Sequence, residues 1–415
     1  MFIDHPLFNK AKNILIQLEN EGHEAYFVGG CIRDMILGRE ISDVDIATSA
    51  YPQEVQQIFP KHFDVGLEHG TVMVLSNQET YEVTTFRTES GYQDYRRPDK
   101  VEFVKDLSED LLRRDFTMNA LAMTKDGEII DYFAGQEAIK HQEIIAVGIA
   151  DERFNEDALR MLRAVRFAGQ LNFSIESETY DAIAHHAPLL SKIAVERILV
   201  EMNKLWESLH WQQGLSAFYQ TKLYQYCPLT DSLAKSFEHL LNDFAPSTPF
   251  NEATLAWTLV LWFQDESAIS PQKFGKAWKM SNANIELIND WLTIIQYREQ
   301  HNDYSNWKLY QLNGQLVQDF EDFLCEQQDA HSPFGNYFSP AMPDEVTKQY
   351  QDLPIHSLKD LAIGGREIIQ SFAPKNKRLI GKSLKWLEKE VVCGRIVNKK
   401  DLLLSELSKS FNWKG

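Results

Sequence analysis

The segment GGCIRDMILGREISDVDIAT, which runs from Gly29 to Thr48, decides the predicted fold of the N-terminal part of this chain. The Gly-Gly pair follows an apolar run and predicts a turn between a strand and a short helix. ISDVDIAT then predicts a second strand, on which residues two apart face the same side of a sheet. Asp43 and Asp45 are therefore expected to project side by side, while Val44 faces the covered side.

This pair of carboxylates predicts a site for phosphate and metal chemistry. Adjacent carboxylates repel each other, and Mg²⁺ is commonly held by one or two carboxylates together with substrate phosphates. The glycine pair lets a phosphate approach the backbone closely, and Arg33 supplies a positive charge one helical turn later. The alternative is a pair of solvated surface residues beside an ordinary turn. The conjunction of these features in one short window favours a nucleotidyl-transfer site.

The first 150 residues mix helical and strand patterns. A helix is predicted at 7–20, and strands are predicted at 24–28, 44–48, 70–75, 81–86 and 101–104. The alternating strand TYEVTTFR would let Glu82 bring a third carboxylate to the first two. The polar segment RTESGYQDYRRPDK, at 87–100, has the composition of a mobile loop. Helical periodicity takes over after about residue 153, so the sequence predicts an α/β catalytic head followed by an elongated all-α arm.

Composition limits the class of protein. The chain has 415 residues, of which 44% are hydrophobic, and no stretch approaches the ~20 apolar residues of a membrane span. It lacks a signal-peptide pattern, and its four cysteines lack metal-ligand spacing. These features predict a cytoplasmic protein without a membrane partner.

The net charge of −18 opposes long-range attraction to nucleic acid, although local charge can override the total. A basic set near the C-terminus comprises Lys375, Lys377, Arg378, Lys382, Lys385, Lys389, Arg395, Lys399 and Lys400. This pattern suits an enzyme that grips one RNA and then releases it. A solvated, lysine-rich helix remains the alternative.

The segment RRDFTMNALA, at 113–122, combines two cations with a carboxylate and an amide. An arginine here can meet a triphosphate, and Asp115 can accept a hydrogen bond from a ribose hydroxyl. Taken alone, an Arg-Arg-Asp run is also an ordinary surface patch.

The segment FNEDALRMLRAVRF, at 154–167, predicts a helix with the buried stripe Ala158, Leu159, Leu162 and Val165. Asp157 and Arg160 are three residues apart and are expected to lie together on another face, which Arg163 and Arg166 extend. Because a carboxylate only accepts and a guanidinium only donates, the pair matches the edges of cytosine and adenine and mismatches uracil and guanine. It would thus select C and A without a template. The residue pair alone equally suits an ordinary helix salt bridge.

Five motifs in this order and spacing resemble the class II tRNA nucleotidyltransferases: GGCIRDMILG, SDVDIAT, YEVTTFRTES, RRDFTMNA and EDALRMLRAVRFA. Within that class the chain resembles the CCA-adding enzymes of Gram-positive bacteria. The similarity is dense over 24–173 and returns in LAIGGREII and IGKSLKWLEKEVVCGRIVNKKDLL. The resemblance implies a polymerase beta-like head and template-independent addition of C, C and A to the 3′ end of tRNA. CTP and ATP would be the substrates of a two-metal phosphoryl transfer.

The resemblance also implies a role for each site residue. Asp43 and Asp45 would bind Mg²⁺, and Glu82 would be a third catalytic carboxylate. The nucleotide would be bound by Gly30, Arg33, Arg114 and Asp115, and its base edge would be read by Asp157 and Arg160 with support from Arg163 and Arg166. Segment 87–100 matches an element associated with the switch from C to A addition. The family layout predicts a head at 1–150, a neck at 151–206, a body at 207–330, and a tail at 331–415 that binds the tRNA acceptor and T-arm region.

Several alternatives share these motifs. An enzyme that adds only A behind a separate CC-adding enzyme would have nearly the same sequence, and bacterial poly(A) polymerases belong to the same class. A non-catalytic tRNA-binding protein with a retired head is a third alternative, although a retired site need not keep Asp43, Asp45 and Glu82. The family includes homodimers, and the sequence leaves the oligomeric state open. The chain has no His-Asp dipeptide, so no phosphohydrolase activity is expected.

Overall fold

The computed structural model describes residues 5–63, 70–93, 97–245, 249–264 and 269–413. Across these ranges, the helices all fall short of the length and apolar character that a bilayer crossing requires. The chain divides into two compact units. Unit 1 comprises Met1–Leu241, Pro249–Ala256 and Phe263–Ser281, and unit 2 comprises Asn242–Thr248, Trp257–Trp262 and Asn282–Gly415.

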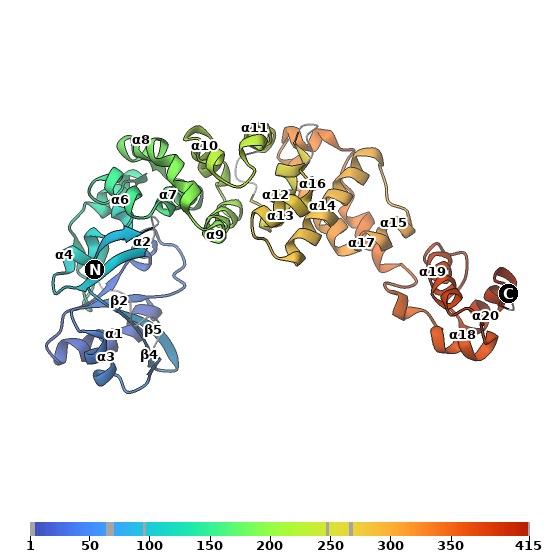
Figure 1. The fold of residues 1–415 in the computed structure, drawn as a ribbon, viewed down its shortest axis with the longest axis horizontal. Helices are drawn as coiled ribbons and strands as arrows, with labels where there is room; N and C mark the ends of the chain where they lie inside the picture. The colour runs from blue at the N-terminus through green and yellow to red at the C-terminus, as the bar shows by residue number, and fades with distance from the viewer. Residues whose placement is uncertain (1–4, 64–69, 94–96, 246–248, 265–268, 414–415) are drawn as a thin grey trace. The chain divides into compact units, whose positions relative to one another are not determined.

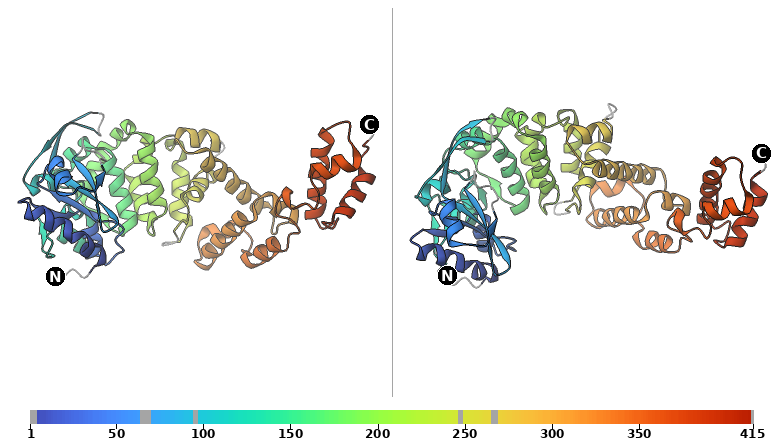
Figure 2. Two further views of the ribbon diagram at one scale, coloured as in Figure 1. Left: turned by 90° about the horizontal axis from the view of Figure 1, so that it is seen from below. Right: turned by 60° about the horizontal axis from the view of Figure 1, so that its bottom comes forward.

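A mixed seven-stranded sheet lies in unit 1 (Figures 1 and 2). Its strand order is β3-β4-β5-β2-β1-β8-β9. Strands β2 (Asp45–Thr48) and β5 (Glu79–Thr85) pair in parallel with Ile46 opposite Val83, whereas the other neighbouring pairs are antiparallel. The remaining strands are β1 (Ala25–Val28), β3 (His62–Phe63), β4 (Thr71–Ser76), β8 (Leu121–Met123) and β9 (Ile129–Asp131). The register carries Glu82 next to the start of β2, where Asp45 lies.

Helices cover both faces of this sheet. Helices α1 (Pro6–Asn20) and α3 (Pro52–Ile58) pack together on one face, where the rings of Phe8 and Phe27 lie 5.0 Å apart. On the other face, α4 (Leu107–Leu112) shares an apolar cluster with Ala47 of β2. Side chains two apart on a strand share a face. Asp45 therefore projects on the α4 side.

The described parts of the predicted loop at 87–100 instead belong to two antiparallel strands, while 94–96 lie outside the described residues. Strands β6 (Arg87–Gln93) and β7 (Arg97–Phe103) form a separate two-stranded sheet with Arg87 opposite Phe103. Backbone groups make this ladder. A ribbon outside the main sheet does not need the alternating apolar pattern that marks a core strand, so the polar composition gave no sign of it.

A group of helices follows the sheet in unit 1, with α7 (Leu159–Leu171) packed against α9 (Val195–Trp206) and α10 (Trp211–Gln220). The predicted stripe of Ala158, Leu159, Leu162 and Val165 is buried, as expected. Gly214 permits the close approach of α10, because a Cβ there would lie 2.4 Å from the carbonyl oxygen of Val165. The other elements of unit 1 are α2 (Gly30–Ile36), α5 (Gly135–His141), α6 (Ala150–Glu156), α8 (Ser177–His186), α13 (Pro271–Ala277), and the short parallel strands β10 (Glu143–Ile144) and β11 (Ser174–Ile175). Helices α11 (Ala234–Asp243) and α12 (Ala253–Trp262) are each divided between the two units.

Unit 2 is helical, as the sequence predicted. It contains α14 (Asn282–Gln300), α15 (Asn306–Gln311), α16 (Gly314–Asp329), α17 (Pro343–Gln351), α18 (Gly365–Phe372), α19 (Arg378–Val392) and α20 (Lys400–Ser410). Arg298 and Glu321 form a fully buried ion pair of 2.7 Å between α14 and α16. Arg298 also donates to the carbonyl oxygen of Pro340, and Tyr304 donates its hydroxyl to Glu321. This network satisfies both charges inside the apolar packing.

The C-terminal part of unit 2 has its own apolar cluster, which includes Ile368, Leu387, Leu403 and Leu407. The nine basic residues at 375–400 are all exposed around this cluster. Within this set, Arg395 forms an ion pair of 2.6 Å with Glu390. The short 3₁₀ helices described along the chain are η2 (Thr117–Asn119), η3 (Ala187–Lys192), η4 (Leu223–Tyr226), η5 (Asp231–Leu233), η6 (Pro333–Tyr337) and η7 (Leu358–Asp360).

Candidate active site

A polar cavity of about 610 Å³ in unit 1 brings the predicted site residues together. Its volume lies within the usual range of small-molecule sites. The cavity is lined by Gly29, Gly30, Arg33, Asp43, Asp45, Arg113, Arg114, Asp115, Asn119, Asp157, Leu159, Arg160, Arg163, Arg166, Phe167, Gln170 and Arg197. Every predicted site residue is in this set except Glu82. Residues from β2, α2, α7 and the segment after α4 therefore meet at one place.

The glycine turn has the geometry that the sequence predicted. Gly29 precedes α2 with φ 84° and ψ −143°, a conformation that side chains rarely adopt. A Cβ at this position would lie 2.9 Å from Nη1 of Arg114. Glycine thus allows the turn and leaves the backbone open beside an arginine.

The acidic pair alternates with buried neighbours, as expected. Asp43 and Asp45 are exposed, whereas Val44 and Ile46 are buried. The strand itself begins at Asp45, so Asp43 lies in the connection before β2 and not on the predicted strand. Glu82 is exposed on β5, the neighbouring strand. These three carboxylates therefore lie around the start of β2.

Electrostatics make this acidic group suited to a cation. Partial burial, followed by the negative charges of Asp43 and Glu82, raises the pKa of Asp45 to about 6. The raised pKa means that ionised Asp45 is unfavourable in the metal-free protein. A divalent cation that prefers oxygen ligands would stabilise the ionised carboxylates. Asp43 and Asp45 are the residues of this cavity that can hold such an ion.

Arg33 is held rigidly beside the acidic pair. Its guanidinium pairs with Asp34 at 2.8 Å and donates from Nη1 to Oδ1 of Asn119 at 2.6 Å. It also lies over the ring of Phe167, 5.0 Å from the centroid. These contacts fix the position of a buried positive charge in the cavity wall.

Arg113 and Arg114 follow α4 and share one buried acid. Asp110 accepts from Nη2 of Arg113 at 2.8 Å and from Nη2 of Arg114 at a longer 3.5 Å. Nε of Arg114 is buried without a hydrogen-bond partner among the described residues. Arg114 lines the cavity beside the glycine turn, with Nη1 2.9 Å from where a Cβ at Gly29 would be.

Asp115 is buried and fully engaged. It accepts from Nε of Arg163 at 2.7 Å, from Nδ2 of Asn119 at 3.0 Å and from the backbone N–H of Phe116 at 2.8 Å. Burial alone would raise the pKa of Asp115, but the Arg163 charge and these hydrogen bonds outweigh it and lower the pKa to about 2. The predicted ribose acceptor is thus also a support for Arg163.

We expect Asp115→Asn to lower the free energy of unfolding at pH 7 by about 2 kcal/mol. The folded pKa of about 2 lies below the unfolded value of about 3.9, so the stabilisation is fully present above pH 4. It is lost as the pH falls toward 2. Urea unfolding of the variant and the wild type at several pH values measures the difference. A difference that does not shrink below pH 4 would contradict this origin, and Asp126→Asn, at an exposed aspartate, is the control.

The prediction of a paired Asp157 and Arg160 within one helix is wrong in its local geometry. Asp157 lies in the break between α6 and α7, with extended backbone, and its Oδ1 accepts from the N–H of Leu159 at 3.0 Å. A short polar acceptor satisfies a free N–H at a helix start, so the chain leaves the helix here. Arg197 of α9 makes two hydrogen bonds to Asp157, of 3.2 and 2.7 Å.

Arg160 has separate partners. It pairs with Glu156 at 2.6 Å and donates to the backbone carbonyl oxygens of Arg153 and Arg113. Arg160 and Asp157 therefore form ion pairs with Glu156 and Arg197, and not the helix salt bridge with each other that was the alternative. Both side chains nevertheless line the same cavity, each held by its own network.

Arg166 completes the basic wall. It pairs with Glu201 of α9 at 2.6 Å, and its guanidinium lies 3.8 Å from the centroid of the Phe167 ring. Sequence reasoning missed Arg197 and Asn119 as cavity residues. A partly buried carboxylate such as Asp157 is expected to have a positively charged partner, but the sequence does not indicate that this partner is Arg197. Asn119 stands in the RRDFTMNALA motif, and its spacing from Asp115 is the available signal.

Comparisons with known proteins match most of this chain to known families. Residues 25–145 match the family model for the Poly A polymerase head domain, 172–233 the model for an RNA- and SrmB-binding site of polymerase A, and 248–407 the model for the second domain of tRNA nucleotidyltransferases. Nucleotidyltransferases of this kind use a divalent metal ion, which the exposed acidic pair fits.

Curated relatives match nearly the whole chain. The CCA-adding enzyme of Enterococcus faecalis is 43% identical over 399 residues, which cover 96% of this chain and 95% of the relative. That of Limosilactobacillus reuteri is 46% identical over 404 residues, covering 97% and 96%.

Solved structures give the same result. The Bacillus stearothermophilus CCA-adding enzyme in complex with CTP is 35% identical, with a TM-score of 0.85 over 98% of each chain. The Thermotoga maritima CCA-adding enzyme complexed with tRNA is 19% identical with a TM-score of 0.62, and it shares the fold. Identities of 43–46% over nearly the full length of both chains decide the family, and this chain belongs to the CCA-adding enzymes, which are tRNA nucleotidyltransferases.

Proposed function

We propose that this chain adds C, C and A to the 3′ end of tRNA, with CTP and ATP as substrates and pyrophosphate as product. The observation that carries the proposal is the single cavity that joins the acidic pair Asp43 and Asp45 to seven arginines: Arg33, Arg113, Arg114, Arg160, Arg163, Arg166 and Arg197. Carboxylates for a metal and guanidinium groups for a triphosphate are the requirements of nucleotidyl transfer.

Asp43 and Asp45 would hold Mg²⁺, the divalent ion that best fits oxygen ligands shared with substrate phosphates. When bound, Mg²⁺ supplies Lewis-acid chemistry, lowering the pKa of the terminal 3′-hydroxyl and neutralising the triphosphate. Glu82 adds a third negative charge from the neighbouring strand and serves the same centre.

The phosphates are bound by Gly30, Arg33 and Arg114. Gly30 lies at the glycine turn that begins α2, and Nη1 of Arg114 lies beside the same turn, 2.9 Å from where a Cβ at Gly29 would be. Arg33 is already fixed by Asp34 and Asn119, so its charge needs no rearrangement to meet the nucleotide. Asp115 lines the nucleotide cavity and keeps Arg163 in place.

Asp157 and Arg160 read the base edge, supported by Arg163 and Arg166. Asp157 keeps acceptor capacity beyond the hydrogen bonds from Leu159 and Arg197, since a carboxylate offers about four lone-pair sites. The separate anchoring of the two side chains supports this reading, because a rigid acceptor and a rigid donor reject a mismatched base. Each unpaired buried group costs about 1–3 kcal/mol.

The exposed basic residues at 375–400 bind the acceptor and T-arm region of tRNA through its phosphates. In this proposal the basic residues belong to a tail at 331–415, which follows a head at 1–150, a neck at 151–206 and a body at 207–330. The four cysteines are free thiols, which supports a reducing, cytoplasmic location.

Extension of defined RNAs tests this function. The purified protein with Mg²⁺ receives tRNA transcripts that lack CCA, end in one C, or end in CC, with CTP and ATP supplied separately and together. Growth of all three to a complete CCA end is the expected result. Extension of the CC-ended transcript alone, by ATP, would assign an A-adding specialist. Binding of tRNA without extension would assign a retired transferase.

We expect metal-dependent activity to fall below pH 6. The pKa of Asp45 is raised to about 6, so protons compete with the divalent ion at lower pH. Well below pH 6, each further unit lowers the fraction of ionised Asp45 about tenfold. The Mg²⁺ concentration that gives half-maximal extension, measured between pH 5 and pH 8, should rise as the pH falls. A constant half-maximal concentration would contradict the assignment of Asp45 as a ligand.

A further inference from the structure

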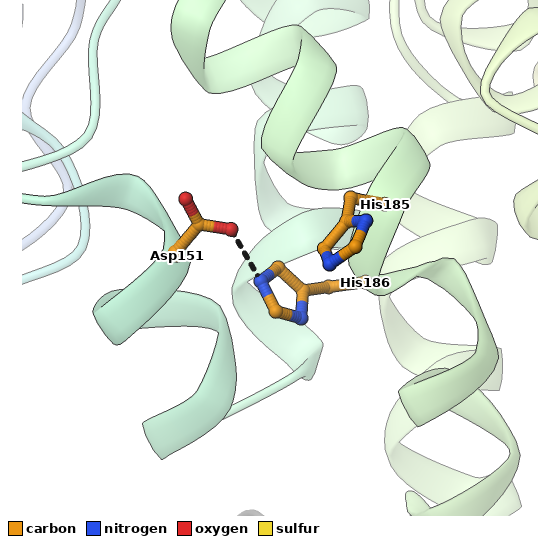
Figure 3. Close-up of side chains that lie close together, drawn as sticks. All are labelled: Asp151, His185 and His186. Carbon is orange, nitrogen blue, oxygen red and sulfur yellow. Dashed lines mark hydrogen bonds and ion pairs between the residues drawn. The ribbon is translucent and has the colours of Figure 1, made fainter.

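A second group of ligand atoms lies outside the cavity, where α6 packs against α8. Asp151 comes from the first turn of α6, and His185 and His186 are the last two residues of α8 (Figure 3). Ligand atoms of the three side chains all lie within 4.8 Å of one another. Nε2 of His186 lies 2.5 Å from Oδ1 of Asp151, as the dashed line in Figure 3 marks.

The donor chemistry differs from that of the active site. Two imidazoles and one carboxylate suit a late first-row transition metal such as Zn²⁺, whereas Mg²⁺ prefers an all-oxygen environment. The rings of His185 and His186 are 4.8 Å apart and nearly perpendicular, at 84°, and a nitrogen of each lies within 4.8 Å of a carboxylate oxygen of Asp151. We propose that Asp151, His185 and His186 bind one Zn²⁺ ion and that this ion joins α6 to α8.

Local charge and access support this site. The histidines lie at the C-terminal end of the ten-residue α8, where the helix dipole favours positive charge. Asp181 is one turn before His185 and adds negative charge on the same face of the helix. The Asp151 side chain is 61% exposed, so an ion and its completing water ligands can enter from solvent.

The position of the ion connects it to the base-reading residues. Helix α6 begins next to Asp151 and ends at Glu156, and its last turn supplies the Glu156 carboxylate and the Arg153 carbonyl oxygen that hold Arg160. An ion at the start of α6 would therefore restrain the helix that supports Arg160. Its role is structural, and it takes no part in phosphoryl transfer.

Zinc titration of the full chain tests the proposal. The protein is stripped with a chelator and then titrated with Zn²⁺ against a chromogenic zinc indicator, in excess Mg²⁺ to occupy oxygen-ligand sites. We expect one Zn²⁺ per chain. His185→Ala, His186→Ala and Asp151→Ala should each weaken binding at least about tenfold, the effect that loss of even an outer-shell partner has on metal sites. The double variant His185→Ala/His186→Ala should lose the site.

Two controls separate this site from others. His141→Ala removes an exposed histidine at the end of α5 and should leave Zn²⁺ affinity unchanged. Asp45→Ala should also retain the Zn²⁺ site, so a loss of zinc binding in that variant would overturn the assignment to α6 and α8. Equal zinc affinity in the wild type and the double variant would overturn it as well.

A second measurement excludes a folding artefact. Zn²⁺ binds the folded state, so it should raise the midpoint of thermal unfolding of the wild type and of His141→Ala, but not of the double variant. Amide hydrogen exchange of 150–156 should become slower in the wild type when Zn²⁺ is present. Unchanged exchange in this segment would contradict the joining of α6 to α8.

Discussion

Asp45→Ala is expected to reduce nucleotide addition by at least about a thousandfold while leaving tRNA binding nearly intact. A catalytic metal supplies several kcal/mol of transition-state stabilisation, and each 1.4 kcal/mol corresponds to a tenfold change in rate. Asp45 interacts electrostatically with both Asp43 and Glu82, so its substitution removes one carboxylate and changes the surroundings of the other two. Single-turnover extension with saturating CTP measures the rate, and filter binding measures tRNA affinity.

A substitution of Asp45 by asparagine distinguishes loss of activity from loss of folding stability. The folded pKa of about 6 lies above the unfolded value of about 3.9. The contribution of Asp45 to stability is therefore greatest below pH 3.9 and is lost as the pH rises through 6. At neutral pH without metal, Asp45→Asn should raise the midpoint of thermal unfolding while abolishing extension. An active Asp45→Asn enzyme would contradict the metal assignment, and Asp126→Asn is the control at an exposed carboxylate outside the cavity.

Asp157→Asn is expected to relax base selection. Asparagine keeps an oxygen that can accept from the N–H of Leu159, but it adds donor hydrogens and removes the charge that pairs with Arg197. The penalty against uracil and guanine should fall by about 1–3 kcal/mol, equivalent to roughly 5- to 150-fold in discrimination. The ratio of kcat/KM for CTP to that for UTP, measured on a transcript lacking CCA, gives this change.

Two further variants make the base-selection test specific. Glu152→Gln changes an exposed acid on α6, outside the cavity, and should leave the ratio unchanged. Arg197→Met should also lower the ratio, because Asp157 then loses the partner that orients its carboxylate. Unchanged discrimination in Asp157→Asn would refute the reading of the base edge by this residue.

The site could be predicted where its residues are close in sequence. Asp43 and Asp45 follow from an alternating polar and apolar pattern over a few residues, and the exposure of both beside buried Val44 and Ile46 confirms that pattern. Asp43, however, lies before β2 and not on the predicted strand. The α/β head and the helical remainder follow from the change in periodicity near residue 153. The resemblance of five ordered motifs then identified the family, which the full-length relatives confirm.

The remaining features depend on contacts that the sequence does not encode locally. Asp157 lies in the break between α6 and α7, where its side chain accepts from the N–H of Leu159, whereas the i,i+3 spacing suggested a continuous helix. Arg197 reaches Asp157 from 40 residues away, and Arg163 reaches Asp115 from 48. The pair of strands β6 and β7 has a polar composition without a core pattern. Such pairings are fixed by tertiary packing, which overrides local propensity.

The buried pair of Arg298 and Glu321 in unit 2 has an evolutionary consequence. Losing either partner leaves an uncompensated charge inside the protein, at a cost of about 3–5 kcal/mol, whereas replacing both by well-packed apolar residues can be neutral. The intermediate with one change is therefore the least fit of the possible genotypes. Descendants of this sequence should keep both residues or change both, so substitutions at 298 and 321 are expected to covary.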